Sequence, residues 1–517
     1  MSTGDENHGS NPPPQAEAGG EAGYGDVKGG ALFSIPGYGW ADVAALEQSM
    51  AGRAVRVRGA AHAVRAVGRR VAFVVLRQGT STVQCVVAAA AGGGDAGMVR
   101  LAAGLSRESV VDVAGVVSLP REPVHGTTQQ QVEIQVKKLH CISRATPNLP
   151  ISVGRRSAKR GRRRQSQSCK LFPAVNLLHH GQAGEQVVHV GQDKRLDYRV
   201  IDLRTPANQA IFRVQCEVEN IFRQVLLSEG FVGIHTPKLI GGSSEGGAAV
   251  FKLDYNGQPG CLAQSPQLHK QMAVCGGFER VFEVGPVFRA EDSNTHRHLC
   301  EFVGLDMEMV IRDHYFEVCD VVDRLFVAMF DHLNKNCTKE LETIDRQYPF
   351  KPLKYLPKTL RIEYDEGIGM LKEAGVHVEA MGDLNTEAEK KLGELVHAKY
   401  GTDLYMLCRY PSAVRPFYTM PCPDDPRYSN SFDVFVRGEE IISGAQRVHI
   451  PELLARQAEA RGIAVGSIAA YIDSFRYGAP PHGGFGVGLE RVVMLFCGLG
   501  NIRKASLFPR DPRRLQP

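Results

Sequence analysis

An arginine- and histidine-rich segment between two apolar runs has the residue types of a phosphate-binding site. Residues 288–298 read Phe-Arg-Ala-Glu-Asp-Ser-Asn-Thr-His-Arg-His and connect the runs Val281–Val287 and Phe302–Met309. A polar segment between two strand-like runs is typical of a hairpin, so Arg289 and Arg297 would lie near its tip. Arginine suits phosphate because its planar guanidinium donates two parallel hydrogen bonds and keeps its charge. The pattern therefore predicts an anion-binding hairpin, with a solvated hairpin as the alternative.

The same hairpin allows a metal site as a second alternative. His296, His298 and Cys300 alternate, so they would share one face of a strand. The sequence shows no fourth ligand, and phosphate binding explains the arginines better.

A second polar segment, Gly438–Arg447, combines oxygen ligands with a guanidinium group. On a strand, Glu440 and Ser443 could converge on Mg²⁺, which prefers oxygen ligands. Arg447 could hold a carboxylate. An ordinary half-exposed strand has the same pattern, so this segment indicates a site only together with others.

A glycine-rich segment, His482–Arg491, precedes the apolar run Val492–Phe496 and predicts a loop leading into a helix. Because glycine has no side chain, a flat ligand could lie against its main chain. Arg491 would lie in the first helical turn, where the helix dipole adds to its charge. A dinucleotide-binding fingerprint is excluded. It needs a second strand with an acidic residue about 20 positions further on, and the 26 residues that follow Arg491 offer no such strand. A structural turn is the alternative.

Two further segments could contribute polar groups. Ser265 and Pro266 fit the N-cap and the first position of a helix. Gln267 and Lys270 would then share one face of that helix. Ser243–Gly247 is a polar loop of the kind that closes over a ligand. A surface helix and an ordinary loop are the alternatives.

Two regions of different pattern must position these residues. Residues 53–145 contain β-branched runs and one helical insert, which favours an OB-type barrel, with a sandwich or an SH3-like barrel as alternatives. Beyond residue 205, amphipathic helices separate apolar strands, which predicts an α+β domain around a mainly antiparallel sheet. The expected strands are Ala54–Arg58, Val71–Leu76, Thr82–Val87, Val110–Val117, Val132–Leu139, Phe231–Thr236, Val281–Val287, Phe302–Met309, Ser431–Val436 and Ile441–Val448. The expected helices are Met98–Leu105, Pro206–Glu229, Tyr315–Leu333, Glu387–Lys399 and Ile468–Tyr477.

Composition excludes several classes of protein. The chain has 517 residues, of which 43% are apolar and 23% charged, as in a globular protein of two to four domains. No run of 18 apolar residues occurs, so we expect no membrane span. The 12 cysteines include no Cys-x-x-Cys pair, which favours free thiols over a zinc ribbon. The first residues resemble neither a signal peptide nor a transit peptide, so we expect a cytoplasmic location.

The net charge of +5 comes from one segment. Ile151–Gly184 holds eight Lys and Arg residues and no acidic residue. The remaining 53 basic and 56 acidic residues leave the rest of the chain at −3. The net charge alone is therefore weak evidence for a polyanionic partner.

Together these segments resemble the signature of the class II aminoacyl-tRNA synthetases, most closely their aspartate-specific eukaryotic cytoplasmic branch. Gly230–Leu239 is similar to motif 1, Phe288–Glu308 to motif 2 and Gly486–Arg491 to motif 3. The resemblance covers residues 53–145 and 185–517. It implies ATP-dependent ligation of L-aspartate to tRNA(Asp) through an aspartyl-adenylate, with Mg²⁺ as cofactor and a homodimer formed through motif 1.

The resemblance implies a nucleotide site in which Arg289 binds the α-phosphate of ATP and Arg491 the γ-phosphate. Phe302 would stack on adenine, and Glu440 and Ser443 would hold Mg²⁺. Arg289, Glu440 and Arg491 would be the catalytic residues. The full ATP-binding set would be Arg289, Ala290, Glu291, Arg297, His298, Leu299, Phe302, Glu440, Gly488, Leu489, Glu490 and Arg491.

The resemblance also implies an aspartate site in which Arg447 and Lys270 pair with the side-chain carboxylate. Asparagine would leave these cations unpaired, which is costly in a buried site. The full set would be Ser244, Glu245, Gln267, Leu268, His269, Lys270, Arg289, Asp306, Ser443 and Arg447. Among these, Ser244, Glu245, Gln267 and Asp306 would lie near the amino group.

The N-terminal barrel would bind the anticodon. Phe73 matches a residue that stacks on an anticodon base, and Arg65, Gln84 and Glu133 match residues that contact the same loop. A core phenylalanine is the alternative for Phe73. We therefore expect a disordered extension (1–30), an OB-fold anticodon-binding domain (31–145), a hinge (146–195) and a class II catalytic domain (196–517).

Three features depart from the family pattern. Residues 1–30 are neutral to acidic where relatives often carry lysines. Phe485 occupies a position where glycine is common; it is either a harmless variant or a residue that narrows the adenine side. The basic stretch 151–184 resembles neither a helix nor an acidic hinge; it is either a linker that grips tRNA or an altered reading of the message. The alternatives for function are an enzyme that also charges tRNA(Asn) and a catalytically inactive RNA-binding protein.

Overall fold

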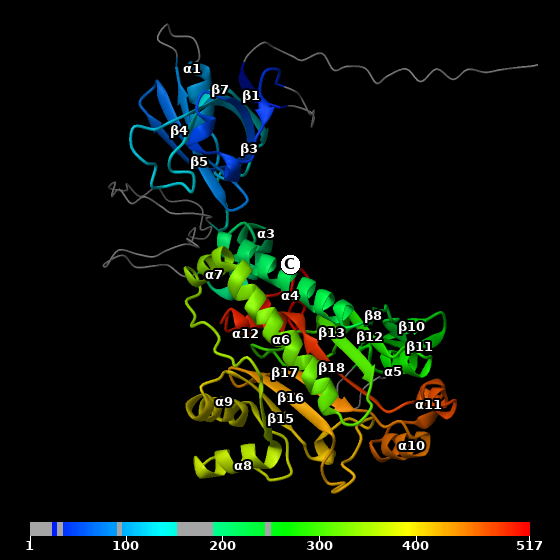
Figure 1. The fold of residues 1–517 in the computed structure, drawn as a ribbon. Coiled ribbons are helices and arrows are strands. Elements are labelled where there is room, and N and C mark those ends of the chain that lie inside the picture. Colours follow the sequence, from blue (N-terminus) through cyan, green and yellow to red (C-terminus); the bar gives the residue numbers. More distant parts are fainter. Residues whose placement is uncertain (1–22, 28–34, 90–95, 152–189, 243–249) are drawn as a thin grey trace, which may run out of the picture. The chain divides into compact units, whose positions relative to one another are not determined.

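The computed structural model describes residues 23–27, 35–89, 96–151, 190–242 and 250–517. The chain forms two compact units, residues 1–176 and 177–517 (Figure 1). The first 22 residues, nearly all of the basic stretch 151–184, and the predicted site residues Ser244 and Glu245 lie outside the described residues. Within the described ranges, no helix is both long enough and apolar enough to cross a membrane.

The first unit is a closed five-stranded barrel, as the strand pattern predicts. Strand β3 pairs with β4 and β6, β4 pairs with β5, and β7 closes the ring by pairing with β5 and β6. A bulge between Ala61 and Ala63 lets the long strand β3 bend, so that its two halves pair with different neighbours. The elements are β1 (Tyr24–Asp26), β2 (Gly39–Trp40), β3 (Ala54–Val67), β4 (Val71–Gln78), β5 (Ser81–Ala88), α1 (Ala96–Ala103), β6 (Val110–Ser118) and β7 (Glu133–Ser143).

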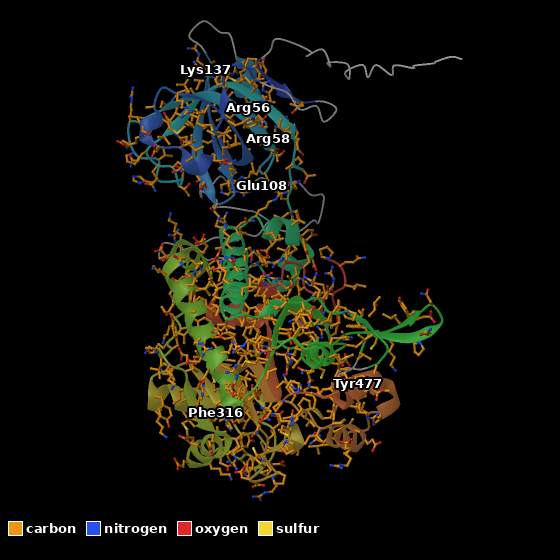
Figure 2. All side chains as sticks on the ribbon, turned by 45° about the vertical axis from the view of Figure 1, so that its right-hand side comes forward. Arg56, Arg58, Glu108, Lys137, Phe316 and Tyr477 are labelled. Atoms are coloured by element: carbon orange, nitrogen blue, oxygen red, sulfur yellow. The ribbon has the colours of Figure 1, made fainter. Side chains whose placement is uncertain are left out.

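Two features of the barrel, the strand β1 and the buried Asp112, do not follow from the sequence predictions. Residues 24–26 fall inside the segment expected to be disordered, yet they form β1, which runs parallel to Leu139–Cys141 of β7. The partly buried Tyr24 packs against the barrel core, and this apolar contact favours order in the short segment. The barrel also buries Asp112, which accepts hydrogen bonds from Arg56 and Arg58 of β3 (both labelled in Figure 2).

The second unit is built on an eight-stranded sheet in the order β14-β15-β16-β17-β18-β13-β12-β8. The six central strands pair antiparallel, as predicted, and the two edge strands pair parallel. The strands are β8 (Val232–Gly233), β12 (Arg280–Phe288), β13 (Glu301–Val310), β14 (Leu360–Glu363), β15 (Leu404–Cys408), β16 (Ser431–Val436), β17 (Glu439–Gln446) and β18 (His482–Gly488). A separate small sheet holds β9 (Leu239–Ile240), β10 (Lys252–Tyr255) and β11 (Gln258–Leu262).

Helices pack on both faces of this sheet. Side chains of β15 alternate between two apolar clusters: Met406 packs with the long helices α4 and α6, and Tyr405 packs with α8 and α9. Helices α4 and α6 lie side by side (Figure 1). The helices are α2 (Gln192–Asp197), α3 (Arg199–Asp202), α4 (Pro206–Ser228), α5 (Gln267–Cys275), α6 (Phe316–Asn336), α7 (Thr338–Asp345), α8 (Tyr364–Glu373), α9 (Thr386–Tyr400), α10 (Pro451–Ala460), α11 (Ala469–Arg476) and α12 (Leu489–Phe496).

The ends of the elements follow local chemistry. Helix α4 begins after the N-cap Thr205, has Pro206 in its first turn, and is followed by Gly230 at a φ of +80°. Helix α5 begins one residue later than predicted, with Pro266 as its N-cap, while Ser265 still accepts a hydrogen bond from the Gln267 N–H. The strand expected at residues 231–236 is reduced to β8.

The glycine-rich segment before Arg491 is a central strand, so the predicted loop is wrong. Strand β18 lies between β13 and β17, and its glycines permit close contact with β13. A Cβ atom on Gly484 would lie 2.1 Å from the Met307 carbonyl oxygen, and one on Gly486 would lie 2.9 Å from Asp306 Oδ1. Glycine inside a strand marks this kind of close approach.

We predict opposite effects for alanine at two helical glycines. A Cβ on Gly393 of α9 would lie 2.5 Å from Gly438 Cα in the turn between β16 and β17, whereas a Cβ on Gly369 of α8 would meet no atom within 4 Å beyond the local backbone of its own helix. Gly393→Ala should therefore lower the free energy of unfolding by about 2 kcal/mol, and Gly369→Ala should raise it by up to about 1 kcal/mol. Urea unfolding monitored by circular dichroism measures both; equal effects would contradict the close contact of α9 with the turn.

Candidate active site

Most of the predicted residues of the second unit that the structure describes converge on one cavity. Its volume is about 290 Å³, and its walls come from α5, the β12–β13 hairpin, β17, β18 and the first turn of α12. The predicted residues that line it are Gln267, Arg289, Glu291, Arg297, His298, Leu299, Phe302, Asp306, Glu440, Ser443, Arg447, Gly488, Glu490 and Arg491.

Five predicted residues that the structure describes do not line the cavity. Leu268 packs into the apolar cluster between α5, α10 and α11, and Leu489 belongs to the main core. His269 is half-buried, and burial and the nearby Lys238 lower its pKa. Lys270 lies buried behind the cavity wall, and Ala290 is also absent from the lining.

Arg289, Arg297 and Arg491 are three of the five arginines that line the cavity. Arg491 donates to the carbonyl oxygens of Glu440 (3.0 Å) and Arg297 (3.2 Å), which holds it across the strand ends. Arg297 donates to Glu389 of α9 at 2.6 Å. The guanidinium carbon of Arg289 lies 5.5 Å from the centre of the Phe302 ring. Burial lowers the pKa of Arg491, because water no longer stabilises its positive charge. A polyanion bound in the cavity would supply that stabilisation.

Two acidic residues, Glu440 and Asp433, lie near these arginines. Burial, and next the charge of Asp433, raise the pKa of Glu440 to about 7. Asp433 is paired in register with Ser443 across β16 and β17. One nitrogen of the buried Arg415 donates to both Asp433 Oδ1 (2.9 Å) and Ser443 Oγ (3.0 Å). A carboxyl group whose pKa is raised by a neighbouring carboxylate is one that a divalent cation would stabilise, so this oxygen set fits Mg²⁺.

The metal site considered for the hairpin is not supported. Within the ranges that the structure describes, no cluster of three or more His, Cys, Asp or Glu side chains could hold a metal ion. His296 Nε2 instead lies 3.1 Å from Glu439, and His298 Nδ1 lies 2.6 Å from the Thr295 hydroxyl.

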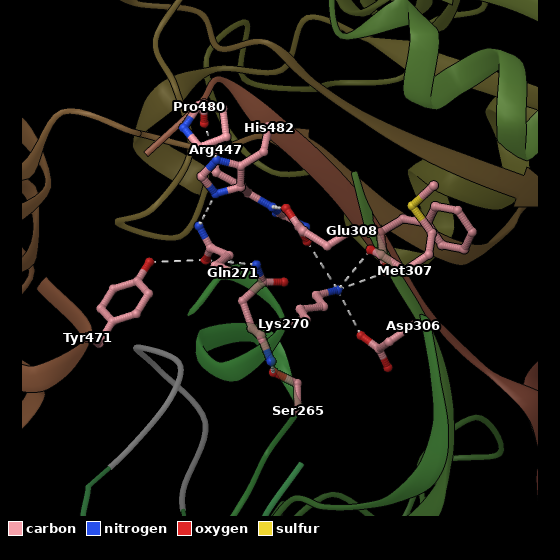
Figure 3. Close-up of polar contacts among 12 residues, drawn as sticks. Ser265, Lys270, Gln271, Asp306, Met307, Glu308, Arg447, Tyr471, Pro480 and His482 are labelled. Carbon is pink, nitrogen blue, oxygen red and sulfur yellow. Dashed lines mark hydrogen bonds and ion pairs between the residues drawn. The ribbon is translucent and has the colours of Figure 1, made fainter. Parts of the chain in front are cut away.

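Arg447, which lines the cavity, and the buried Lys270 share one buried carboxylate, that of Glu308. Arg447 donates to Glu308 Oε1 at 2.9 Å, and Lys270 Nζ lies 3.5 Å from Glu308 Oε2 (Figure 3). Lys270 also donates to Asp306 (3.0 Å) and to the Phe485 carbonyl oxygen (3.0 Å). Burial alone would raise the pKa of Glu308, but Arg447 and Lys270 hold it below its usual value.

The structure favours the harmless-variant interpretation of Phe485 over the one in which it narrows the adenine side. Its side chain is fully buried in the main core, and it is absent from the cavity lining. Only its carbonyl oxygen reaches the site, where it accepts from Lys270. The ring therefore does not narrow the cavity.

Sequence reasoning missed three charged residues of this site. Glu308 and Asp433 are acidic residues inside apolar strands, and Glu308 stands two positions after Asp306, so the period-two pattern could have found them. Arg415 lies in a connecting segment without periodicity. Only the fold brings its guanidinium 3.8 Å from the centre of the Tyr410 ring.

In the first unit, the four predicted RNA-contacting residues lie on neighbouring strands of the barrel. Arg65 of β3 is paired with Phe73 of β4, and its guanidinium lies 6.0 Å from the Phe73 ring. Gln84 of β5 is paired with Glu133 of β7, and its amide donates to that carboxylate at 2.9 Å. None of the four is fully buried, whereas the residues on either side of Phe73, Gln84 and Glu133 along their strands fill the barrel core. This face can therefore meet a ligand.

Comparisons with known proteins agree for both units. Residues 191–512 match the family model described as tRNA synthetases class II (D, K and N), and residues 55–142 match the OB-fold nucleic acid binding domain. The chain is 61% identical to Aspartate--tRNA ligase 2, cytoplasmic, of Arabidopsis thaliana, over 94% of this chain and 85% of that protein. It is 50% identical to the human cytoplasmic aspartate--tRNA ligase, over 90% of this chain and 88% of that protein.

Solved structures give the same result. The aspartyl tRNA synthetase of Entamoeba histolytica superposes with a TM-score of 0.83 at 41% identity, over 98% of this chain and 100% of that chain. The asparaginyl-tRNA synthetase of Pyrococcus horikoshii complexed with asparaginyl-adenylate superposes with a TM-score of 0.74 at 31% identity, over 91% and 98%.

We predict that Glu308→Gln destabilises the second unit strongly. The change would leave Arg447 and Lys270 buried with too little negative charge, which should cost about 3 kcal/mol of unfolding free energy. Glu366→Gln is the matched control, because Glu366 pairs with Lys399 at the surface and its loss should change stability by less than about 0.5 kcal/mol. Urea unfolding distinguishes the two; a Glu308→Gln variant as stable as the control would refute the role given to this carboxylate.

Proposed function

Because this chain belongs to the cytoplasmic aspartate–tRNA ligases, a family of class II tRNA synthetases, we propose that its cavity forms aspartyl-adenylate and passes the aspartyl group to tRNA(Asp). The observation that carries this proposal is that one cavity is lined by Arg289, Arg297 and Arg491 and also by Arg447. These are the cations needed for a polyphosphate and for an acidic amino acid. They also argue against an inactive RNA-binding protein.

The chemistry requires positioning and charge compensation rather than a protein nucleophile. A carboxylate oxygen of aspartate attacks the α-phosphorus of ATP, the bond to the bridging oxygen breaks, and pyrophosphate leaves with the electron pair. Two anions must approach each other, so guanidinium groups that are already oriented lower the barrier. We assign Arg289 to the α-phosphate and Arg491 to the γ-phosphate. The terminal ribose hydroxyl of tRNA then attacks the carbonyl carbon, and AMP leaves.

Several residues would complete the nucleotide site. Phe302 would stack on adenine, and Glu291, Arg297, His298 and Leu299 would contact the nucleotide. Mg²⁺, which the family typically uses, would be held by Glu440 and Ser443. When bound, it would neutralise charge on the phosphate oxygens. The raised pKa of Glu440 and the nearby Asp433 support this assignment.

Aspartate would be recognised by charge. Arg447 and Lys270 would pair with its side-chain carboxylate, and Asp306 and Gln267 would contact its amino group. Lys270 does not line the cavity itself, but it donates a hydrogen bond to Asp306, which does. Asparagine offers no side-chain charge to these cations, and a site built for a charged group rejects a ligand without one.

The proposed partners are a second copy of the chain and tRNA. Leu227, Val232 and Leu239, which flank or belong to the motif 1 segment, are about half exposed, and apolar surface of this kind supports a homodimer. The barrel face around Phe73 would bind the anticodon, since aromatic side chains stack on unpaired bases. We place the protein in the cytoplasm, as its relatives' names state.

We predict aspartate-dependent ATP–pyrophosphate exchange by the purified chain. Arg491→Ala should lower the exchange rate by about 1000-fold, because it removes a cation that opposes charge developing in the reaction. Binding of tRNA(Asp) should change by less than about 2-fold, since the proposed anticodon face lies on the barrel. Arg427→Ala, a change in an exposed arginine, is the control. A well-folded chain without exchange would overturn the proposed function. Loss of tRNA binding by Arg491→Ala would overturn the assignment of amino-acid activation to the cavity and of anticodon binding to the barrel.

We predict a pH-dependent stability difference at Glu440. The pKa of this group rises from 4.5 to about 7 in the folded chain, so its contribution to stability is full below pH 4.5 and is lost as pH rises through 7. Relative to Glu440→Gln, the wild type should therefore lose about 2 kcal/mol of unfolding free energy between pH 5 and pH 8. Mg²⁺ at pH 8 should restore part of it in the wild type only. Denaturant titrations measure this, with the exposed Glu459→Gln as control; parallel pH profiles would contradict it.

A further inference from the structure

A chain of buried hydrogen bonds leads from His482, the first residue of β18, to the cavity. His482 Nδ1 lies 2.8 Å from the Pro480 carbonyl oxygen, and His482 Nε2 lies 3.0 Å from Gln271 Nε2 (Figure 3). Gln271 Oε1 accepts from Gln267 Nε2 at 2.9 Å. Tyr471 joins as a side branch, because its hydroxyl also donates to Gln271 Oε1 at 3.0 Å. Only Gln267 of this group lines the cavity.

The chemistry of the groups sets the direction of every bond in the chain. A carbonyl oxygen can only accept, so His482 must carry its proton on Nδ1. Burial lowers the pKa of His482, so the ring is neutral and Nε2 is an acceptor. Gln271 therefore turns its NH₂ group toward His482 and its oxygen toward Gln267. Gln267 must then turn its own NH₂ group toward Gln271.

This direction leaves the Gln267 carbonyl oxygen on the other side of its amide. Gln267 lines the cavity together with Asp306, whose carboxylate is held by Lys270. An amide oxygen beside a carboxylate is a favourable setting for an ammonium group, whereas an amide NH₂ group in the same place would repel it. An unrestrained glutamine could present either group.

We infer that His482 is a positioning residue that, through Gln271, orients the Gln267 amide so that its oxygen accepts a hydrogen bond from the α-ammonium group of aspartate. This inference rests on the proposed function. It adds to that function a residue that touches no substrate and a reason for a histidine at the start of a glycine-rich strand.

The test uses the full-length chain, two variants and one ligand that lacks the group in question. His482→Phe keeps a ring but removes the acceptor, and Gln271→Met keeps an unbranched side chain but removes the link. In aspartate-dependent ATP–pyrophosphate exchange, each should raise the KM for aspartate about 10-fold or more, with the KM for ATP unchanged. Tyr471→Phe removes only the side branch and should change the aspartate KM by less than about 3-fold.

Succinate is the decisive probe, because it has both carboxylates of aspartate and no ammonium group. Its inhibition constant against aspartate should stay within about 2-fold of wild type in both variants. A parallel rise in the succinate constant would show general damage to the pocket and overturn the inference, as would an unchanged aspartate KM in a folded variant. Thermal unfolding identifies a variant that fails to fold, and the second variant then decides. Absence of exchange in the wild type would instead overturn the proposed function.

Discussion

The ion pairing of Glu308 is the constraint on which the amino-acid end of the site depends. A carboxylate isolated in a protein interior costs several kcal/mol, so it is tolerated only when its partners are in place. Those partners come from distant parts of the chain: Lys270 from α5, and Arg447 from the position directly after β17. Because the carboxylate itself lies on β13, the charged cluster forms only when three elements have docked in register. The same ion pairs therefore stabilise the unit and fix the geometry of its cavity.

Two glycines of β18 leave the space that this cluster needs. Strand β18 lies against β13 with glycine at positions 484 and 486, where a Cβ would meet the Met307 carbonyl or the Asp306 carboxylate. The intervening Phe485 turns its ring into the core and leaves its carbonyl oxygen for Lys270. Alternation along one strand therefore gives a packed core on one face and a bare, hydrogen-bonding surface on the other.

The sequence predicts those parts of the molecule whose pattern is long or strictly periodic. Helix α4, with its Thr205 cap and Gly230, and strand β16 are found where expected, because an amphipathic face or an apolar run specifies them locally. The sequence predicts a loop in place of strand β18, because glycine favours loops and only the neighbouring strand β13 shows why glycine is required here. Most predicted cavity residues do converge, yet Asp433 and Arg415 were missed, because their contacts join segments that no local pattern relates. The direction of the hydrogen bonds through His482 likewise exists only in the folded chain.

The fold alone does not decide which amino acid enters the cavity. An asparaginyl enzyme shares this architecture with a TM-score of 0.74, so discrimination must depend on a few charges. In this chain Lys270 and Arg447 face Asp306 and Glu308, and the four charges balance. Under the proposed function, aspartate can exchange partners with this set: its ammonium group takes Asp306 while its side-chain carboxylate takes Lys270. Asparagine brings the ammonium group but no second anion, so Lys270 would lose a partner without gaining one. Selectivity then follows from the balanced cluster as a whole rather than from the shape of the cavity.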